Sequence, residues 1–334
     1  MNTTTKKPTK TPKTATERGP YGSQWRRKQT PMRFTDRDGD MLEAVAVNRV
    51  LDRDLMLWLF PPEKAAAPEH VNTKNPERIG TNLDRRLTLL FRNGYLDRVR
   101  TVYGGPFLYA LSDRGAALLR GDDNRAPRLL ETLKGDDWQE KNRTLSTLFL
   151  MHTLAIARVR TAITAAGRVS GWHLSRFDAF NSELTVKITA GQKTTTLRPD
   201  ALVCLVDPNR PSGKNTLHFF LEADRSSMHH DKMARKFRSY ESMRRDNLHR
   251  HHYNMDPFRV LIVTKSRART TALIDLIAGD RVRFHEPDAM RRIFYVATET
   301  DFLDHPENIF ADIWTPTHRP TERAAIVPQP LARQ

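Results

Sequence analysis

Two nearly uninterrupted apolar runs, residues 217–222 and 259–264, constrain the fold of this chain more than any other feature. Runs of that length without alternation are typical of strands that are buried on both faces. Around them the sequence predicts a long helix at 145–166 that Gly167 ends and strands at 172–174, 184–188 and 194–206, the last interrupted by Pro199. It also predicts a basic helix at 231–250, a helix at 268–278 and a strand at 293–297. Residues 144–314 are therefore expected to form a mixed sheet flanked by helices.

The first half of the chain has a different, mainly helical pattern between residues 35 and 120. Thr35, followed by acids in the next turn, is typical of a helix start, and further helices are expected at 53–60 and 76–92. Two short alternating runs around Gly104-Gly105 predict a β-hairpin, and Ser112 is expected to cap a last short helix. Three helices and a hairpin predict a winged helix-turn-helix, so we expect two domains, of α+β and α/β type.

A winged helix presents polar side chains of its third helix to a DNA groove. The candidate DNA contacts are Asn82, Arg85, Arg86 and Arg92 on that helix, with Arg98 and Arg100 in the hairpin. Any one of these arginines can instead belong to a solvated face. The net charge of +16 favours a polyanionic partner, and nucleic acid more than an anionic membrane surface. We therefore expect the domain to bind double-stranded DNA.

The remaining segments are expected to lie outside the two domains. Residues 1–34 contain nine lysines and arginines against one acid, which predicts a disordered basic tail. The charged stretch 121–143 is interpreted as a linker with a short helix, and the proline-rich stretch 315–334 as a second disordered tail. A single cysteine, no secretory signal and no apolar run long enough to span a bilayer predict a cytoplasmic protein.

Three acids lie at strand ends in the second half of the chain. Asp200 follows Arg198-Pro199, and Glu222 and Asp224 end the apolar run 217–222. Residues two apart on a strand face the same way, so we expect Glu222 and Asp224 to share a face and to meet Asp200 if the strands are neighbours. Clustered carboxylates repel one another unless a cation lies between them. The sequence therefore predicts a site for Mg²⁺ or Mn²⁺ held by Asp200, Glu222 and Asp224. As a separate alternative, Asp224 can cap the helix that follows.

The basic helix supplies candidate partners for these acids. Lys232, Lys236 and Tyr240 follow one another at intervals of four residues, so they share one helix face. A lysine there can position the nucleophile or neutralise a phosphate. Tyr240 is either a covalent nucleophile or a packing residue. The histidines near the helix ends are interpreted as exposed or structural, with phosphate or metal contacts as the alternative: His229, His230, His249, His251 and His252.

These motifs resemble the plasmid replication-relaxation proteins, which include the MobC-type relaxases of mobilisable plasmids. The similarity lies in Arg198-Pro199-Asp200, in the run 220–225 and in Lys236-x-x-x-Tyr240. In the first half it lies in the runs 84–87, 93–96 and 109–115. The resemblance covers about residues 35–300 and is strongest around 222–240.

The resemblance implies a nuclease-like domain of the restriction-endonuclease type, known as PD-(D/E)xK, which nicks or melts DNA at an origin. It implies that Asp200 and Glu222 are metal ligands and that Asp224 is a further acid. The usual motif has a lysine two residues after the glutamate, where this chain has Asp224, so the lysine is expected to be Lys236, or else Lys232. His152, in the long helix, is a further candidate beside the site, or a packed helix residue.

The leading hypothesis is therefore a metal-dependent, site-specific DNA nickase, or relaxase, that initiates plasmid mobilisation or replication. The expected partners are a double-stranded plasmid origin, a second copy of the chain and a type IV coupling protein. The alternative is a non-enzymatic replication initiator or transcription regulator with a degenerate nuclease fold, which the displaced lysine favours. A phage or defence nuclease of the same fold is a third interpretation.

Overall fold

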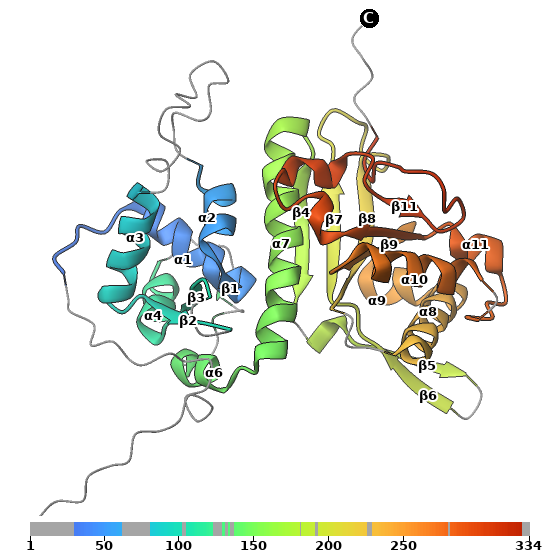
Figure 1. Cartoon of the computed structure of the whole chain (residues 1–334), viewed down its shortest axis with the longest axis horizontal. Coiled ribbons are helices and arrows are strands. Elements are labelled where there is room, and N and C mark those ends of the chain that lie inside the picture. The colour runs from blue at the N-terminus through green and yellow to red at the C-terminus, as the bar shows by residue number, and fades with distance from the viewer. Residues whose placement is uncertain are drawn as a thin grey trace, which may run out of the picture. The chain divides into compact units, whose positions relative to one another are not determined.

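The computed structural model describes residues 30–61, 81–101, 105–122, 129–130, 133, 137–180, 182–190, 193–225, 229–279 and 281–328. The chain divides into two compact units, Met1–Arg53 with Pro68–Leu150 and Asp54–Ala67 with Met151–Gln334. Together they form a mixed α and β protein (Figure 1). Most of the expected basic tail, and the part of the expected third helix before residue 81, lie outside the described residues.

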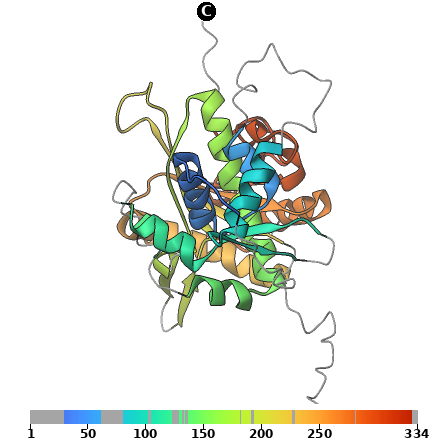
Figure 2. The ribbon, with the colours of Figure 1, turned by 90° about the vertical axis from the view of Figure 1, so that its left-hand side faces the viewer.

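The first unit combines helices with a small antiparallel sheet (Figures 1 and 2). Its elements are α1 (Asp36–Asn48), β1 (Val50–Leu51), α3 (Thr81–Arg92), β2 (Leu96–Val99), β3 (Leu108–Leu111), α4 (Asp113–Arg120) and α6 (Trp138–Thr144). The strand order is β1-β3-β2. The predicted hairpin is confirmed as β2 and β3, and part of its turn lies outside the described residues. The two-residue strand β1 was not predicted from the sequence.

Local hydrogen bonds fix the starts of helices α1 and α4 in this unit. The Asp38 carboxylate accepts hydrogen bonds from the backbone nitrogen and the hydroxyl of Thr35, at 2.7 and 2.8 Å, which confirms the predicted start of α1. Ser112 Oγ accepts from the Gly115 nitrogen at 3.1 Å and confirms the predicted start of α4. A Cβ on Gly115 would lie 2.3 Å from the Tyr95 carbonyl oxygen, so glycine is required there.

Two expected boundaries are wrong. The stretch 121–143 was expected to be a linker, but its helix α6 packs into the first unit. There Trp138 is buried, and Asn142 Nδ2 donates to the Leu111 carbonyl at 2.8 Å. Helix α2 (Arg53–Leu59) was expected within the first domain, but most of it groups with the second unit. The indole of Trp58 packs against the core of that unit, where burial of its large apolar surface is favourable.

The second unit is built on a six-stranded mixed sheet of order β11-β10-β9-β8-β7-β4. Its strands are β4 (His173–Ala179), β7 (Ala201–Val206), β8 (Thr216–Asp224), β9 (Phe258–Thr264), β10 (Phe294–Thr298) and β11 (Thr315–Pro316). The strands β4, β7 and β8 are antiparallel neighbours, whereas β8, β9 and β10 run parallel. A separate hairpin, β5 (Val186–Ala190) with β6 (Lys193–Leu197), lies beyond this sheet (Figure 1).

Helices cover the two faces of the sheet (Figure 1). Helix α7 (Thr147–Ser170) packs on the face formed by residues such as Phe219 and Leu221. Helices α8 (His230–Arg245) and α10 (Arg267–Ala278) pack on the other face, with Phe220 and Ile262. The alternation of β8 residues between the two cores is that of a strand buried on both sides.

Short helical segments complete the second unit. They are the 3₁₀ turns η4 (Ser182–Leu184), η5 (Glu299–Asp301) and η6 (Pro306–Phe310), and the helices α9 (Leu248–Tyr253) and α11 (Pro287–Arg291). Helix α7 is long and apolar enough to cross a membrane by length and composition. Its residues Ile156, Val159 and Ile163 are buried against the sheet, as in the core helix of a globular unit.

Three further expectations are corrected by the structure. The run 194–206 is not one strand: β6 and β7 belong to different sheets, and Pro199, which lacks a backbone donor, lies between them. The expected helix 231–250 is divided into α8 and α9 at Asn247, which adopts a left-handed conformation. Helix α7 does not end at Gly167 but continues to Ser170. Glycine is needed at 167 for another reason, because a Cβ there would lie 2.5 Å from the Trp172 carbonyl oxygen.

The expected disordered tail from residue 315 is also wrong for residues 315–328. Strand β11 pairs with β10, and Ile326 and Val327 are buried beside Trp314, whose Nε1 donates to the Ile309 carbonyl at 2.9 Å. Prolines in this stretch do not prevent packing, because an edge strand tolerates a residue without a backbone donor. Residues 329–334 lie outside the described residues.

Truncation of Trp314 tests whether this C-terminal segment is part of the core. The indole is fully buried, so Trp314→Ala should lower the free energy of unfolding by about 3–5 kcal/mol in urea denaturation. The exposed neighbour Arg319, changed to alanine, serves as the control and should change it by less than about 0.5 kcal/mol. Equal small effects of the two substitutions would contradict the packing described here.

Candidate functional site

Two carboxylates meet where β7 begins and β8 ends. Because β7 and β8 are antiparallel, with Ala201 opposite Leu221, the start of one strand lies beside the end of the other. The Asp200 nitrogen donates to the Leu221 carbonyl at 3.0 Å, and Asp200 Oδ2 accepts from the Ala223 nitrogen at 2.8 Å. Asp200 is therefore held on both sides of Glu222, as the sequence predicted from the order of the strands.

Glu222 is buried, and both of its carboxylate oxygens have partners on α8. Its side chain is 3% exposed. Lys236 Nζ forms an ion pair with Oε2, and the Tyr240 hydroxyl donates to Oε1 at 2.5 Å. The spacing of four residues puts Lys236 and Tyr240 on one face of the helix, as expected. The structure thus brings together four predicted site residues: Asp200, Glu222, Lys236 and Tyr240.

The electrostatics of this cluster follow from burial and from the close charges. Burial raises the pKa of Glu222 to about 7, and the nearby Asp200 adds to the rise, while the ammonium of Lys236 opposes it. Burial acts against the charged form of Lys236, but Glu222 and Asp200 outweigh it and raise the pKa of its ammonium. A carboxyl that holds a proton near neutral pH beside a charged lysine is typical of functional sites.

His152 joins the site from α7, on the other side of the sheet. Its Nε2 lies 3.3 Å from Asp200 Oδ1, and its side chain is 35% exposed. The hydrogen bond to Asp200 raises the pKa of the imidazole, although burial opposes the rise. Burial would raise the pKa of Asp200, but the hydrogen bond from His152 and the charge of Lys236 lower it below its usual range. The placement beside the site, rather than simple packing, is the one observed for His152.

Asp224 does not join the other two carboxylates. Its side chain is nearly fully buried and accepts from Arg269 on α10, at 2.5 Å from Nε and 3.3 Å from Nη2. Within the described ranges, no group of three or more His, Cys, Asp or Glu side chains has the arrangement of a metal site. The expected convergence of three carboxylates is therefore wrong. Glu222 and Asp224 project to the same face of β8, as expected, but Arg269 of α10 binds Asp224.

The other candidates near α8 lie apart from this cluster. Lys232 is exposed, as are His229, His230, His251 and His252. His249 is buried, with its ring 5.0 Å from that of Phe258. Tyr240 is fully buried and hydrogen-bonded to Glu222, which is the surrounding of a positioning residue rather than of an accessible nucleophile.

The carboxylates of Asp200 and Glu222 are the kind of ligand that a hard divalent cation prefers. Mg²⁺ is commonly bound by one or two carboxylates and keeps several waters or substrate oxygens as further ligands. The partly exposed Asp200 and the buried Glu222 offer oxygen donors, and the raised pKa of Glu222 reflects burial and carboxylate repulsion that a cation would relieve. Asp224 is instead bound by Arg269 through both of its oxygens.

In the first unit, the predicted DNA contacts fall into two groups. Asn82, Arg85 and Arg92 are exposed on one face of α3. Arg86 instead forms an ion pair with the fully buried Asp38 carboxylate. The guanidinium carbons of Arg98 and Arg100 lie over the ring of Phe107, at 4.9 and 3.9 Å from its centroid. The hairpin arginines and Arg86 therefore have structural partners.

The sequence analysis missed a second group of charges beside the site. Glu299, after β10, binds both Arg158 of α7 and Arg225, the residue that follows β8. Thr264 and Thr298 lie in register at the ends of β9 and β10, and the hydroxyl of Thr270 contacts both, at 2.6 and 2.9 Å. The ion pairs of Glu299 join the end of β10 to α7 and to the end of β8, and the threonine contacts join α10 to the ends of β9 and β10. Their partners come from distant segments, so no local motif predicts them.

Comparison with protein families gives one match. A family described as Replication-relaxation matches residues 68–258, which is more than half of the chain and includes Asp200, Glu222, Lys236 and Tyr240. No curated protein matches the chain, and no solved structure does.

The proton on Glu222 provides a direct test of the site's electrostatics. The folded-state pKa of about 7 lies above the ordinary value, so ionisation of this carboxyl opposes folding. The stability that the protonated Glu222 carboxyl contributes is complete below about pH 4.5 and is lost as the pH rises through 7. Carboxyl ¹³C NMR of glutamate-labelled protein should show one resonance that titrates near pH 7 and that is absent in Glu222→Gln. In Lys236→Met its midpoint should move higher. Ordinary titration near pH 4.5 would contradict this description.

Proposed function

Because the chain belongs to the replication-relaxation family, which indicates a role in plasmid replication or mobilisation, we propose that it binds DNA at a plasmid origin and cuts one strand there. The observation that carries this proposal is the buried Glu222 carboxylate, joined to Lys236 and adjacent to Asp200. Two acids and a lysine at the adjacent ends of two interior strands are groups that can support hydrolysis of a phosphodiester.

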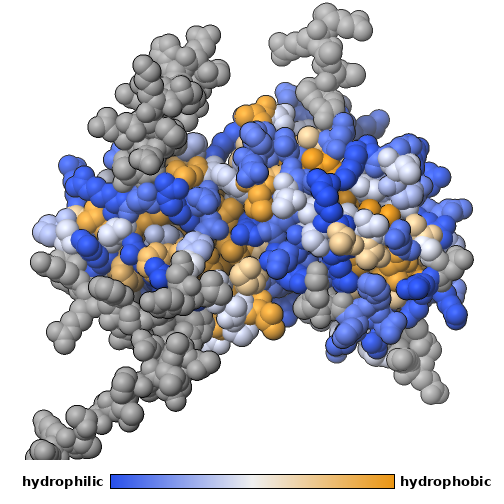
Figure 3. Space-filling model, viewed as in Figure 1, coloured by the Kyte–Doolittle hydropathy of each residue, from blue (hydrophilic) through white to orange (hydrophobic). Residues whose placement is uncertain are grey.

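The first unit supports DNA binding. Its helices and its antiparallel hairpin suit a winged helix in which α3 enters the groove. The exposed face of α3 offers Asn82, Arg85 and Arg92. Hydrophilic side chains cover much of the face of the molecule seen in Figure 3. The net charge of +16 over the whole chain favours DNA as the partner.

The topology of the second unit supports a nuclease-like fold of the PD-(D/E)xK type. A long helix is followed by three antiparallel strands, a second helix and a parallel strand, with helices on both faces. Asp200 and Glu222 occupy adjacent ends of two of these strands. Asp224 occupies the position two residues after Glu222, and the lysine comes from α8 instead.

Each residue then has a distinct role in the cut. A divalent ion bound to Asp200 and Glu222 would supply positive charge for the phosphate oxygens and lower the pKa of a water. The ammonium of Lys236 donates hydrogen bonds to the phosphate as negative charge develops on it. Tyr240 holds the Glu222 carboxylate through Oε1, and His152 holds Asp200 through Oδ1.

A plasmid relaxation assay with Glu222→Gln tests this proposal. Supercoiled plasmid carrying the origin should be converted to open circles by the native protein with Mg²⁺ or Mn²⁺. The substitution removes the buried carboxylate but keeps its shape, so nicking should fall by at least about 100-fold while DNA binding persists. Glu307→Gln changes an exposed glutamate of the same unit and should nick normally.

The same assay separates two roles for Tyr240. Tyr240→Phe removes the hydroxyl but keeps the buried ring. If Tyr240 only positions Glu222, this variant retains nicking at a reduced rate and forms no covalent protein–DNA adduct. Complete loss of nicking, together with a covalent adduct in the native protein, would show that Tyr240 is the nucleophile.

A second function, that of a non-enzymatic replication initiator or regulator, is favoured by one observation. Lys236 and Tyr240 already occupy both oxygens of Glu222, and Arg269 neutralises Asp224. A degenerate nuclease fold would be stabilised in this way. Salt-sensitive binding to the origin without nicking in any divalent metal would establish this alternative.

A further inference from the structure

The β5–β6 hairpin lies beyond the six-stranded sheet and leads directly into the candidate site (Figure 1). One of its faces is buried: Val186, Ile188 and Leu197 pack in the same core as Phe237 of α8. Only Arg198 and Pro199 separate β6 from Asp200. The hairpin is therefore fixed on the helix that carries Lys236 and is joined closely to the residue that precedes β7.

The opposite face of the hairpin is exposed and carries hydroxyl and cationic side chains. Lys187 pairs in register with Thr196, and Thr189 pairs with Thr194. All four are exposed, as is Arg198. Within the part of the chain that the structure describes, neither Lys187 nor Arg198 forms an ion pair. Lysine, arginine and threonine are side chains that commonly bind phosphate oxygens and the sugar of DNA.

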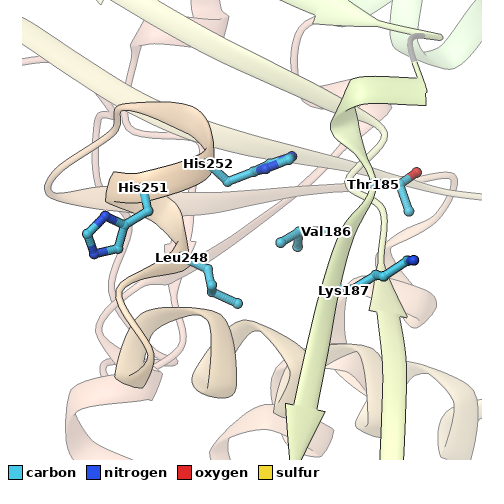
Figure 4. Close-up of a pocket in the computed structure, with 6 residues that line it drawn as sticks. All are labelled: Thr185, Val186, Lys187, Leu248, His251 and His252. Atoms are coloured by element: carbon cyan, nitrogen blue, oxygen red, sulfur yellow. The ribbon is translucent and has the colours of Figure 1, made fainter.

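An open hollow of about 460 Å³ lies between β5 and α9, on the side of the hairpin that carries Val186 (Figure 4). Figure 4 shows Val186 and Leu248 facing each other across it, with His251 on the side of α9 and Lys187 on the side of β5. The Lys187 side chain extends to the other side of β5, so the hollow and the exposed cationic face lie on opposite sides of the hairpin (Figure 4).

Hydrogen bonds hold helix α9 against η4, the turn that precedes the hairpin. His252 Nε2 lies 2.9 Å from the Glu183 carbonyl oxygen, and the Tyr253 hydroxyl donates to the Leu184 carbonyl at 2.8 Å. The contacts with α8 and α9 therefore lie on the side of the hairpin opposite Lys187 and leave its exposed face open to solvent.

From this placement we infer that the exposed face of β5–β6, with Arg198, binds the sugar–phosphate backbone of the DNA strand that reaches Asp200. The inference rests on the proposed function and adds the path of the strand. Lys187 and Arg198 bind consecutive parts of the backbone, and the hydroxyl of Thr196, opposite Lys187, donates to a phosphate oxygen. The second unit thus has a DNA contact of its own, separate from that of the first unit.

The test compares two double variants of the full chain with equal net charge. Lys187→Gln with Arg198→Gln removes both cations of the surface. Lys214→Gln with Arg281→Gln is the control, because both residues are exposed and Lys214 lies in the turn at the other end of β7 and β8. Binding to a labelled origin duplex is measured by fluorescence anisotropy between 50 and 200 mM salt, without divalent metal so that no strand is cut.

Loss of two phosphate contacts should lower the slope of log affinity against log salt by about 1.8, and the control should leave it unchanged. Identical slopes for the two double variants would overturn the inference, whether or not the native protein nicks DNA. A lower slope for the first variant supports the surface even if the nicking assay fails. The two ideas are therefore tested separately.

Discussion

The buried ion pair between Glu222 and Lys236 is the interaction on which the site depends. A carboxylate that is almost fully removed from water costs several kcal/mol unless partners compensate for the lost hydration. Here Lys236 and Tyr240 bind its two oxygens from one face of α8. That requirement fixes the position of α8 over the end of β8, and with it the hairpin that packs on α8. Burial also raises the pKa of Glu222 to about 7, so the same packing that stabilises the unit tunes the group that we propose to be functional.

The sheet supplies the second constraint. Antiparallel pairing of β7 with β8 brings Asp200 to the end of the strand that carries Glu222, and backbone hydrogen bonds hold it there. Helix α7 adds His152 from the opposite face. The ion pairs of Glu299 with Arg158 and Arg225 join α7 to the end of β8. The site is thus built from groups on both faces of the sheet, while the parallel strands β9 and β10 form the neighbouring core.

Much of this arrangement could be predicted from the sequence, because it depends on local patterns. Uninterrupted apolar runs identified the central strands of the sheet, and helical spacing placed Lys236 and Tyr240 together. The ion pair of Asp224 with Arg269 could not be predicted, because Arg269 lies on helix α10, 45 residues away in the chain. The packing of Trp314, Ile326 and Val327 could not be predicted from a proline-rich stretch, nor could the packing of the expected short helix α6 be predicted from a charged one. Tertiary contacts decided these cases, and composition alone does not report them.

The most direct test of the central claim compares two lysines one turn apart on α8. Lys236→Met removes the partner of Glu222, whereas Lys232→Met changes an exposed lysine of the same helix. Single-turnover nicking of the origin plasmid would be measured for both, with origin binding as the control for folding. Our account predicts that nicking is lost in Lys236→Met and retained in Lys232→Met, with equal binding. Equal nicking by both variants would contradict it, because the buried pair would then have no part in cutting DNA.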